Sequence, residues 1–438
     1  MKIRLMLATL ALTVLQSSFQ MAGAQSRDSV PAYPPDLGAS VRHDAPRSSR
    51  LTLGGYGEAT YQYNFFSDNF NRYKFPAKYA DAKGHGRADL PHAVLMLGYD
   101  FGHGWSFGTE VEFEHGGVEA AVEMEADEAG EFEKEVERGG EVALEQFWLQ
   151  KSFSPKANLR LGHIVVPVGA TNNAHLPNQF FGVFRPEGEN TLFPCTWHET
   201  GISFFGRAGQ WRYEVQVIPA LNSNMFDKAS WANNASASAY EFRSANNLAL
   251  AARIDNYSLP GLRLSLSGYV GNTFNNDILT YNNSRYADVK GTVFIGAFDF
   301  LGHWGDFTLR GNADYGYLGD ASAISTFNTG LDNSSNSPYL HTLVGQQVYA
   351  LGCEAGYTLG KKFTPFVRID AYNSYIPATT QANSFLWTAR RCYAVGLNYQ
   401  PLPEIVIKGE VGYRDFAQQY NDEPWVAVGI TWAAFFKK

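Results

Sequence analysis

The chain has no long apolar run outside its N-terminus. Its 438 residues are 45% hydrophobic, and the mean hydropathy is -0.25. A membrane-spanning helix needs about 20 consecutive, mainly apolar residues. The sequence therefore excludes a protein that crosses a membrane with several helices.

Cysteine is scarce, and positive charge is not in excess. The three cysteines, Cys195, Cys353 and Cys392, do not form a disulfide framework. Cys353 and Cys392 fall within predicted strands, where we expect small packing residues, although a disulfide between them stays open. The formal net charge of -8 argues against a nucleic acid partner.

Signatures of catalysis are also missing. The sequence has no G-x-S-x-G and no H-E-x-x-H motif, and most histidines fall in predicted turns and loops. We therefore expect no enzyme activity, no metal site and no cofactor.

The N-terminus has the pattern of a secretory signal peptide. Residues 1–24 combine Lys2 and Arg4 with an apolar stretch and end in the small residues 22–24. Residues 25–50 are rich in Pro, Ser and charge, which predicts a flexible periplasmic leader. Residues 51–438 form the remaining predicted domain.

Aromatic residues, glycines and alternating segments are abundant in that domain. The segment 262–267 (LRLSLS) places every second residue on the same face of a strand. Short joints alternate with long polar ones. The short joints are residues 101–104, 154–156, 206–209, 259–261, 302–305, 360–362 and 401–403. The long joints include residues 64–91, 116–141, 166–197, 220–246 and 316–345.

This rhythm predicts an all-β fold, a transmembrane antiparallel up-and-down β-barrel with short periplasmic turns and long outer loops. We expect about 16 strands, with 18 as the alternative. The expected strands are 51–63, 92–101, 105–115, 142–153, 158–165, 198–206, 211–219, 247–255, 262–271, 291–300, 307–315, 346–357, 363–372, 391–400, 404–414 and 425–436.

If the apolar face of each strand meets lipid, the opposite face lines a lumen. Repeated ionisable residues on that face are costly in a dry core and ordinary in a water-filled channel. The expected wall residues are Arg160, Arg212, Arg253, Arg263, Arg310, Arg368, Arg390, Lys408, Arg414, Glu110, Glu112 and Glu114. Carboxylates dominate the early strands and arginines the later ones. This predicts either a transverse electric field or a mesh of salt bridges, and the sequence leaves both open.

The third long loop, residues 166–197, is more aromatic than a solvated loop requires. Its flanks carry the segments 162–169 (GHIVVPVG) and 196–201 (TWHETG). In these segments the chain resembles the Gram-negative outer-membrane porins, most closely the phosphate-selective porin O/P-like family. The resemblance implies a homotrimer and a third loop folded into the lumen. It also implies a pore constriction near His175, Arg185, Glu187 and Glu189. The loop lacks the dense Lys/Arg array of a phosphate channel, so narrow anion specificity is not expected.

Two further segments bear on partners. The alternating last strand resembles the recognition segment of substrates of the barrel-assembly machinery, although the chain ends in Lys437 and Lys438. The acidic segment 119–145 predicts a protruding hairpin. Its acidic face either is simply solvated or binds divalent cations near lipopolysaccharide or at the pore mouth.

Together these patterns predict a porin in the outer membrane of a Gram-negative bacterium, surrounded by lipid and lipopolysaccharide. Small hydrophilic solutes or ions would diffuse through it passively. The alternatives are a channel selective for an anion such as phosphate or for an oligosaccharide, and a plugged barrel that serves as an adhesin or anchor.

Overall fold

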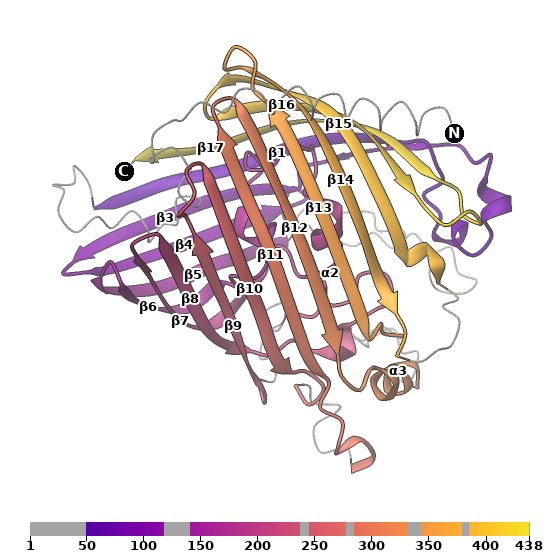
Figure 1. Cartoon of the computed structure of the whole chain (residues 1–438), viewed down its shortest axis with the longest axis horizontal. Helices are drawn as coiled ribbons and strands as arrows, with labels where there is room; N and C mark the ends of the chain where they lie inside the picture. The colour runs from indigo at the N-terminus through magenta and orange to yellow at the C-terminus, as the bar shows by residue number, and fades with distance from the viewer. Residues whose placement is uncertain are drawn as a thin grey trace.

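The chain forms one closed β-barrel (Figure 1). The computed structural model describes residues 50–117, 141–236, 245–276, 284–330, 343–378 and 385–437. The predicted signal peptide, nearly all of the leader and most of the acidic segment lie outside these residues.

All strands belong to a single antiparallel sheet. Their bounds are β1 Leu51–Asn64, β2 His85–Asp89, β3 His92–Gly102, β4 Trp105–Glu114, β5 Glu141–Ser154, β6 Ala157–Val165, β7 His198–Ala208, β8 Trp211–Pro219, β9 Leu248–Asn256, β10 Leu262–Asn272, β11 Thr292–Trp304, β12 Phe307–Leu318, β13 Gln347–Tyr357, β14 Phe363–Ile376, β15 Ala389–Leu402, β16 Ile405–Asp415 and β17 Glu423–Lys437. Pairing of β1 with β17 closes the ring, with Gly57 opposite Trp432. The sixteen-stranded barrel predicted from the sequence is confirmed.

One short strand, β2, adds to the ring without enlarging it. It pairs with the outer half of β1, where Asn64 lies opposite His85. β3 pairs with the other half of β1, where Gly57 lies opposite Ala93. Four of the five residues of β2 are polar or glycine, so the segment has no apolar alternation by which the sequence could reveal it.

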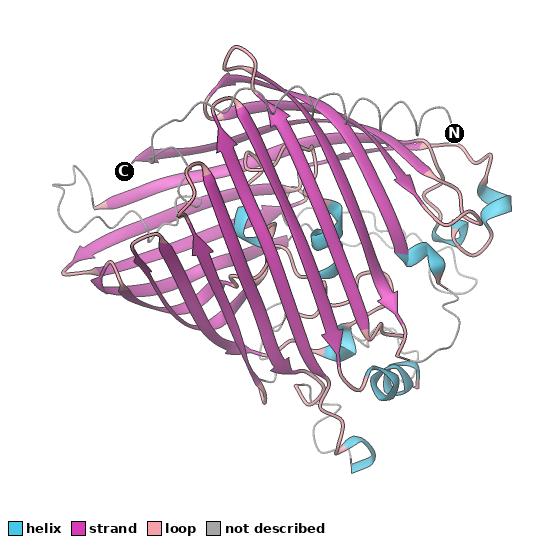
Figure 2. Ribbon diagram, viewed as in Figure 1, coloured by secondary structure: helices cyan, strands magenta, loops and turns pink. Residues whose placement is uncertain are grey.

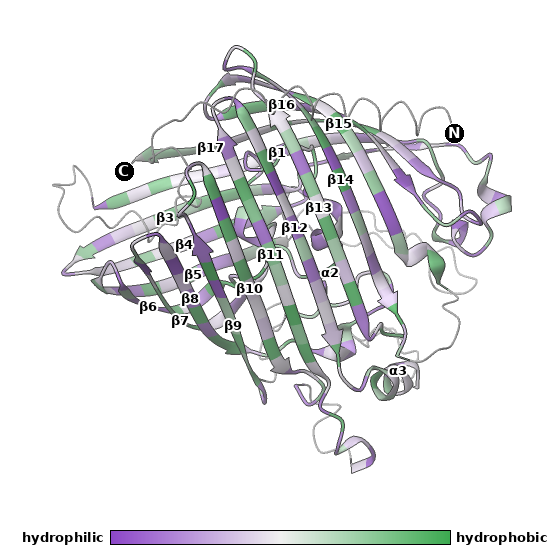
Figure 3. Cartoon of the chain, viewed as in Figure 1, coloured by the Kyte–Doolittle hydropathy of each residue, from purple (hydrophilic) through white to green (hydrophobic). Residues whose placement is uncertain are grey.

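Inward charge and outward apolarity alternate along the strands. On β9, Leu250 and Ile254 are 46% and 41% exposed, whereas Arg253 and Asp255 are 3% and 0% exposed. Figure 3 shows the same alternation of apolar and polar residues along neighbouring strands. The apolar side chains therefore cover the outside of the barrel, and ionisable groups face its interior.

Helices are few and short (Figure 2). They are α2 Glu187–Leu192, α3 Ala321–Thr329, and the 3-10 turns Phe70–Arg72, Pro76–Tyr79, Asn172–Ala174, Ser223–Met225, Ser284–Tyr286 and Leu386–Thr388. Within the described residues, no helix combines the length and apolarity needed to cross a bilayer.

The interior is filled from the end that bears the long loops. Residues 166–197, here named L3, contribute Trp197 to a buried apolar cluster. The loop after β8 contributes Trp231, α3 contributes Ile324, and the strand wall contributes Val348. L3 therefore folds inward, as predicted, and packs on the wall and on neighbouring loops.

Candidate pore constriction

Lys408 of β16 fastens the tip of L3 to the barrel wall. The lysine is 2% exposed. Its ammonium donates hydrogen bonds to the carbonyl oxygens of Pro177, Phe180 and Gly182, at 2.5, 2.8 and 2.8 Å. Backbone carbonyls buried away from water need such donors. One side chain therefore uses all three of its protons to hold a single loop.

Neighbouring wall residues hold the next part of the L3 backbone. Arg368 donates to Phe184 O at 3.0 Å, and Asn398 donates to Phe181 O at 3.0 Å. The carboxylate of Glu410 accepts a hydrogen bond from Val183 N, also at 3.0 Å. Because these contacts reach backbone atoms, they fix the course of L3 largely independently of its side chains.

Glu187, at the start of α2, faces the arginine-rich side of the barrel. Its carboxylate accepts hydrogen bonds from Arg414 Nε at 2.7 and 2.9 Å and from the Tyr372 hydroxyl at 2.6 Å. Arg390 Nη1 lies 3.7 Å away. Burial alone would raise the pKa of Glu187, but the guanidinium groups of Arg414 and Arg390 lower it to about 2. L3 is thus tied to β14, β15 and β16 by an ionised carboxylate.

Glu189, two positions further along α2, contacts L3 itself. It is 1% exposed and accepts hydrogen bonds from the backbone N–H groups of Ala170 and Thr171 at 3.0 and 2.9 Å. Burial, followed by the nearby charge of Asp299, raises the pKa of Glu189 to about 7. Its place is therefore the base of the loop, away from the arginines that bind Glu187.

The titration of Glu189 predicts a pH dependence of stability. Since folding raises its pKa from 4.5 to about 7, its stabilising effect is complete below pH 4.5 and lost as the pH rises through 7. We expect the Glu189→Gln variant to lack this decline, which amounts to on the order of 3 kcal/mol in the free energy of unfolding. Urea unfolding followed by tryptophan fluorescence, at pH 4 and pH 8, measures the slope. Glu404→Gln at an exposed turn is the control, and equal slopes in wild type and Glu189→Gln would contradict the assignment.

His175 and Arg185 lie on the other side of L3. His175 is 7% exposed, its Nδ1 hydrogen-bonds the carbonyl of Asn172 at 2.9 Å, and Arg185 donates to the carbonyl of His175 at 3.3 Å. Burial lowers the pKa of His175. Both side chains act electrostatically on carboxylates of β1, β4 and β5. These carboxylates are Glu58, Glu112 and Glu145; together with Glu110 and Glu114 of β4 they are here named the acidic wall.

The predicted wall arginines lie on the inner faces of their strands and contact acceptors there. Arg253 binds Asp255 at 2.8 Å and Asp299 at 2.9 Å. The other contacts are Arg212 with Glu214 and Asp255, Arg263 with Asp299, Arg310 with Glu354, Arg368 with Asp370, Arg414 with Glu187 and Glu423, and Arg160 with the amide of Gln150. Of the two arrangements left open by the sequence, the salt-bridge mesh describes the arginine side.

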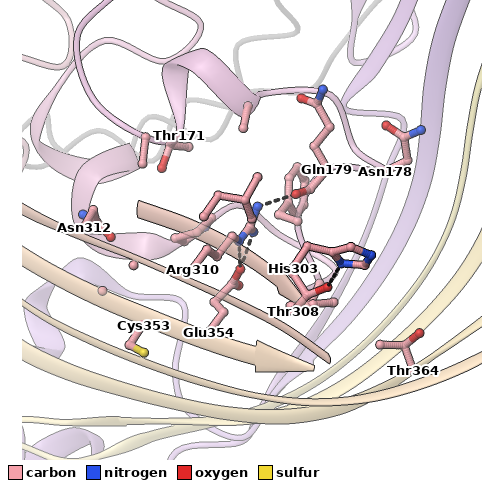
Figure 4. A pocket seen from close by; sticks show the side chains of 18 of the residues that line it. Thr171, Asn178, Gln179, His303, Thr308, Arg310, Asn312, Cys353, Glu354 and Thr364 are labelled. Atoms are coloured by element: carbon pink, nitrogen blue, oxygen red, sulfur yellow. Dashed lines mark hydrogen bonds and ion pairs between the residues drawn. The ribbon is translucent and has the colours of Figure 1, made fainter. Parts of the chain in front are cut away.

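A cavity of about 510 Å³ lies between L3 and the arginine side, near the short turns. Figure 4 shows Arg310 at its centre, between the Gln179 carbonyl and Glu354. Most of the other polar groups are neutral, among them Asn178, Asn312, Thr308 and Thr364. The cavity therefore presents amides and hydroxyls to a solute more than free charge.

Sequence reasoning omitted several residues from the predicted site. Tyr372 and Asn398 hold L3, yet they are neutral and were outside a search for ionisable groups. Glu145 and His92 also belong to the acidic wall, and their inward parity was the available signal, as it was for Glu58, which strand parity had already placed on the lumen face. The contacts between L3 and β16 could not be predicted, since residues such as Val183 and Glu410 are more than 200 positions apart in the sequence.

Comparison with known proteins shows the fold. No family model matches the chain. An uncharacterised protein of Aquifex aeolicus (strain VF5) is 23% identical over 395 residues, which cover 87% of this chain and 79% of that protein. The anion-selective porin of Comamonas acidovorans superposes with a TM-score of 0.51 at 12% identity, covering 88% of this chain and 99% of the porin. The outer membrane channel DcaP of Acinetobacter baumannii gives 0.52 at 13% identity, covering 88% and 97%. The barrel architecture is thus that of porins.

Proposed function

We propose that this protein is a channel of a Gram-negative outer membrane through which small hydrophilic solutes or ions diffuse passively. One observation carries the proposal: a closed barrel has an apolar outer face and charged side chains on its inner face. A water-soluble barrel would show the reverse, because its outside meets water. The predicted signal peptide and leader agree with export to that membrane.

The contacts of the arginines favour general diffusion over a narrow phosphate selectivity. Arg212, Arg253 and Arg263 each bind a carboxylate, which reduces the positive charge available to a passing anion. The contacts of the wall arginines therefore do not support the predicted membership of the phosphate-selective porin O/P-like family. The homotrimer, the barrel-assembly machinery as folding partner and contact with lipopolysaccharide remain predictions of the resemblance and of the last strand.

Planar-bilayer recording tests the channel. Purified barrel, checked for folding by heat-modifiable migration in electrophoresis, is added to a bilayer in potassium chloride. We expect stepwise, ohmic conductance increments, and competition by phosphate or sugars distinguishes general diffusion from selective binding. Folded protein that inserts and gives no increments would overturn the channel and favour a plugged adhesin or anchor.

A further inference from the structure

The acidic wall brings imidazole and carboxylate groups together near the outer end of the lumen. His92, at the start of β3, lies opposite Glu114 of β4 in the strand register. Its Nδ1 lies 2.7 Å from Glu112 Oε1, and its Nε2 lies 3.6 Å from Glu58 Oε1. Carboxylates from β4 and β1 therefore lie at the two different ring nitrogens of His92.

His92 compensates the burial of Glu58 only in part. Its side chain is 7% exposed. Among the described residues, its Oε2 atom is buried without a hydrogen-bond partner. The 3.6 Å between Glu58 Oε1 and His92 Nε2 is too long for a hydrogen bond. It is close to the separation, roughly 3.4 Å, of two ligands on a tetrahedral metal with bonds of about 2.1 Å. A buried carboxylate needs a compensating positive charge.

A second group of donors lies deeper along the same wall. One ligand atom each from Glu110, Glu145 and His175 lies within 4.8 Å of the others, and all three residues are buried. Tyr56 donates to Glu145 Oε2 at 2.9 Å, whereas Glu145 Oε1 is buried without a hydrogen-bond partner among the described residues. Here the imidazole comes from L3 and the carboxylates from β4 and β5.

The hydrogen bonds of the two histidines decide which ring nitrogen is available. His175 Nδ1 must donate to the Asn172 carbonyl, which cannot donate. His92 Nδ1 lies 2.7 Å from Glu112 Oε1 and donates to it when that oxygen carries no proton. A neutral imidazole that donates from Nδ1 carries a lone pair on Nε2. In most metal-binding histidines the nitrogen that does not bind the metal donates such a hydrogen bond, which orients the ring. Lone pairs and carboxylates directed at one another repel unless a cation lies between them.

We propose that the acidic wall binds divalent transition-metal cations at two successive sites. The outer site uses His92 Nε2 and Glu58, with Glu112 at Nδ1 orienting the ring, and the inner site uses His175, Glu110 and Glu145. Mixed imidazole and carboxylate ligands suit Zn²⁺ and its neighbours better than Ca²⁺ or Mg²⁺. The inner site joins L3 to the barrel wall, so its occupancy couples cation binding to the constriction. Cation binding itself does not depend on the proposed function. Only the statement that these cations permeate or block the channel rests on the proposed channel.

Zinc binding by the folded barrel tests the two sites. Isothermal titration with Zn²⁺ in detergent is compared for wild type, Glu58→Gln, and the double variant His92→Gln/His175→Gln. We expect at least tenfold weaker binding in the double variant and loss of the outer event in Glu58→Gln. His103→Gln, on an exposed short turn, is the matched control. Ca²⁺ in place of Zn²⁺ should bind at least tenfold more weakly.

The outcomes separate this proposal from the channel. The two sites would be overturned if zinc binding were unchanged in the double variant or absent in wild type. Conductance measured without zinc would in that case still support the channel. Zinc binding to a barrel that never conducts would overturn the channel and leave the sites. If the double variant does not fold, Glu58→Gln and the cobalt absorption spectrum of wild type, with its ligand-field bands, decide the question.

Discussion

Replacing Lys408 with methionine is expected to raise single-channel conductance and to add rapid current fluctuations. Methionine keeps most of the volume but donates no hydrogen bond, so the carbonyls of Pro177, Phe180 and Gly182 lose their shared partner. Hydrogen bonds to charged groups each contribute about 1.5–3 kcal/mol. Their loss lowers the free energy that holds L3 to the wall, and the loop spends more time away from it. Bilayer recording at constant voltage measures both effects.

Lys362→Met is the matched control, since Lys362 is exposed on a short turn. It should leave conductance and noise unchanged. The barrel strands of the Lys408→Met variant should still migrate as folded protein, because the substitution acts on the loop. Identical current traces from Lys408→Met and wild type would show that L3 does not limit the channel.

The substitution Glu187→Gln is expected to shift ion selectivity towards anions by about fivefold. It removes the carboxylate that binds Arg414 and Arg390, and one unit charge at about 4 Å from a passing ion is worth roughly 1 kcal/mol in water. Reversal potentials across a potassium chloride gradient measure the ratio of chloride to potassium permeability.

The acid titration of Glu187 provides a second readout. Because folding lowers its pKa to about 2, the ion pair is complete above the ordinary value near 4.5 and is lost as the pH falls through 2. Wild type and variant should therefore differ equally at pH 5 and pH 8, and the difference should fall to about half near pH 2 and vanish below it. Glu404→Gln serves as the neutral control. Unchanged reversal potentials in Glu187→Gln would place Glu187 outside the conduction path.

Much of the barrel is readable from the sequence because each lipid-spanning strand repeats one simple constraint. The alternation of Leu262–Asn272 is imposed by the two media on either side of the barrel wall. It can therefore be recognised within one strand, without knowing which strands pair with it. The same constraint places Arg368, Lys408 and Arg414 on the inner face. β2 escapes this reading because its residues do not contact an apolar medium.

The interior contacts follow from packing, which no local pattern encodes. The sequence places Arg185, Glu187 and Glu189 in one loop, yet their side chains lie in three different surroundings. Glu187 binds wall arginines, Glu189 binds the backbone of its own loop, and Arg185 lies towards the acidic wall. Which of these a residue reaches depends on the fold of L3 in three dimensions, and on charges brought close by strands distant in the chain.

The anchoring of L3 on late strands also constrains the order of assembly. Glu187 and Arg414 are 227 residues apart, as are Val183 and Glu410. L3 is synthesised between β6 and β7, long before β14 to β16 exist. Until those strands arrive, Phe180, Phe181 and the free backbone carbonyls around them have no binding surface. The loop therefore docks late, after β16 has joined the growing sheet, and contacts of such sequence separation are slow to form. Until β14 to β16 have joined the sheet, the part of L3 around Phe180 and Glu187 has no wall to bind.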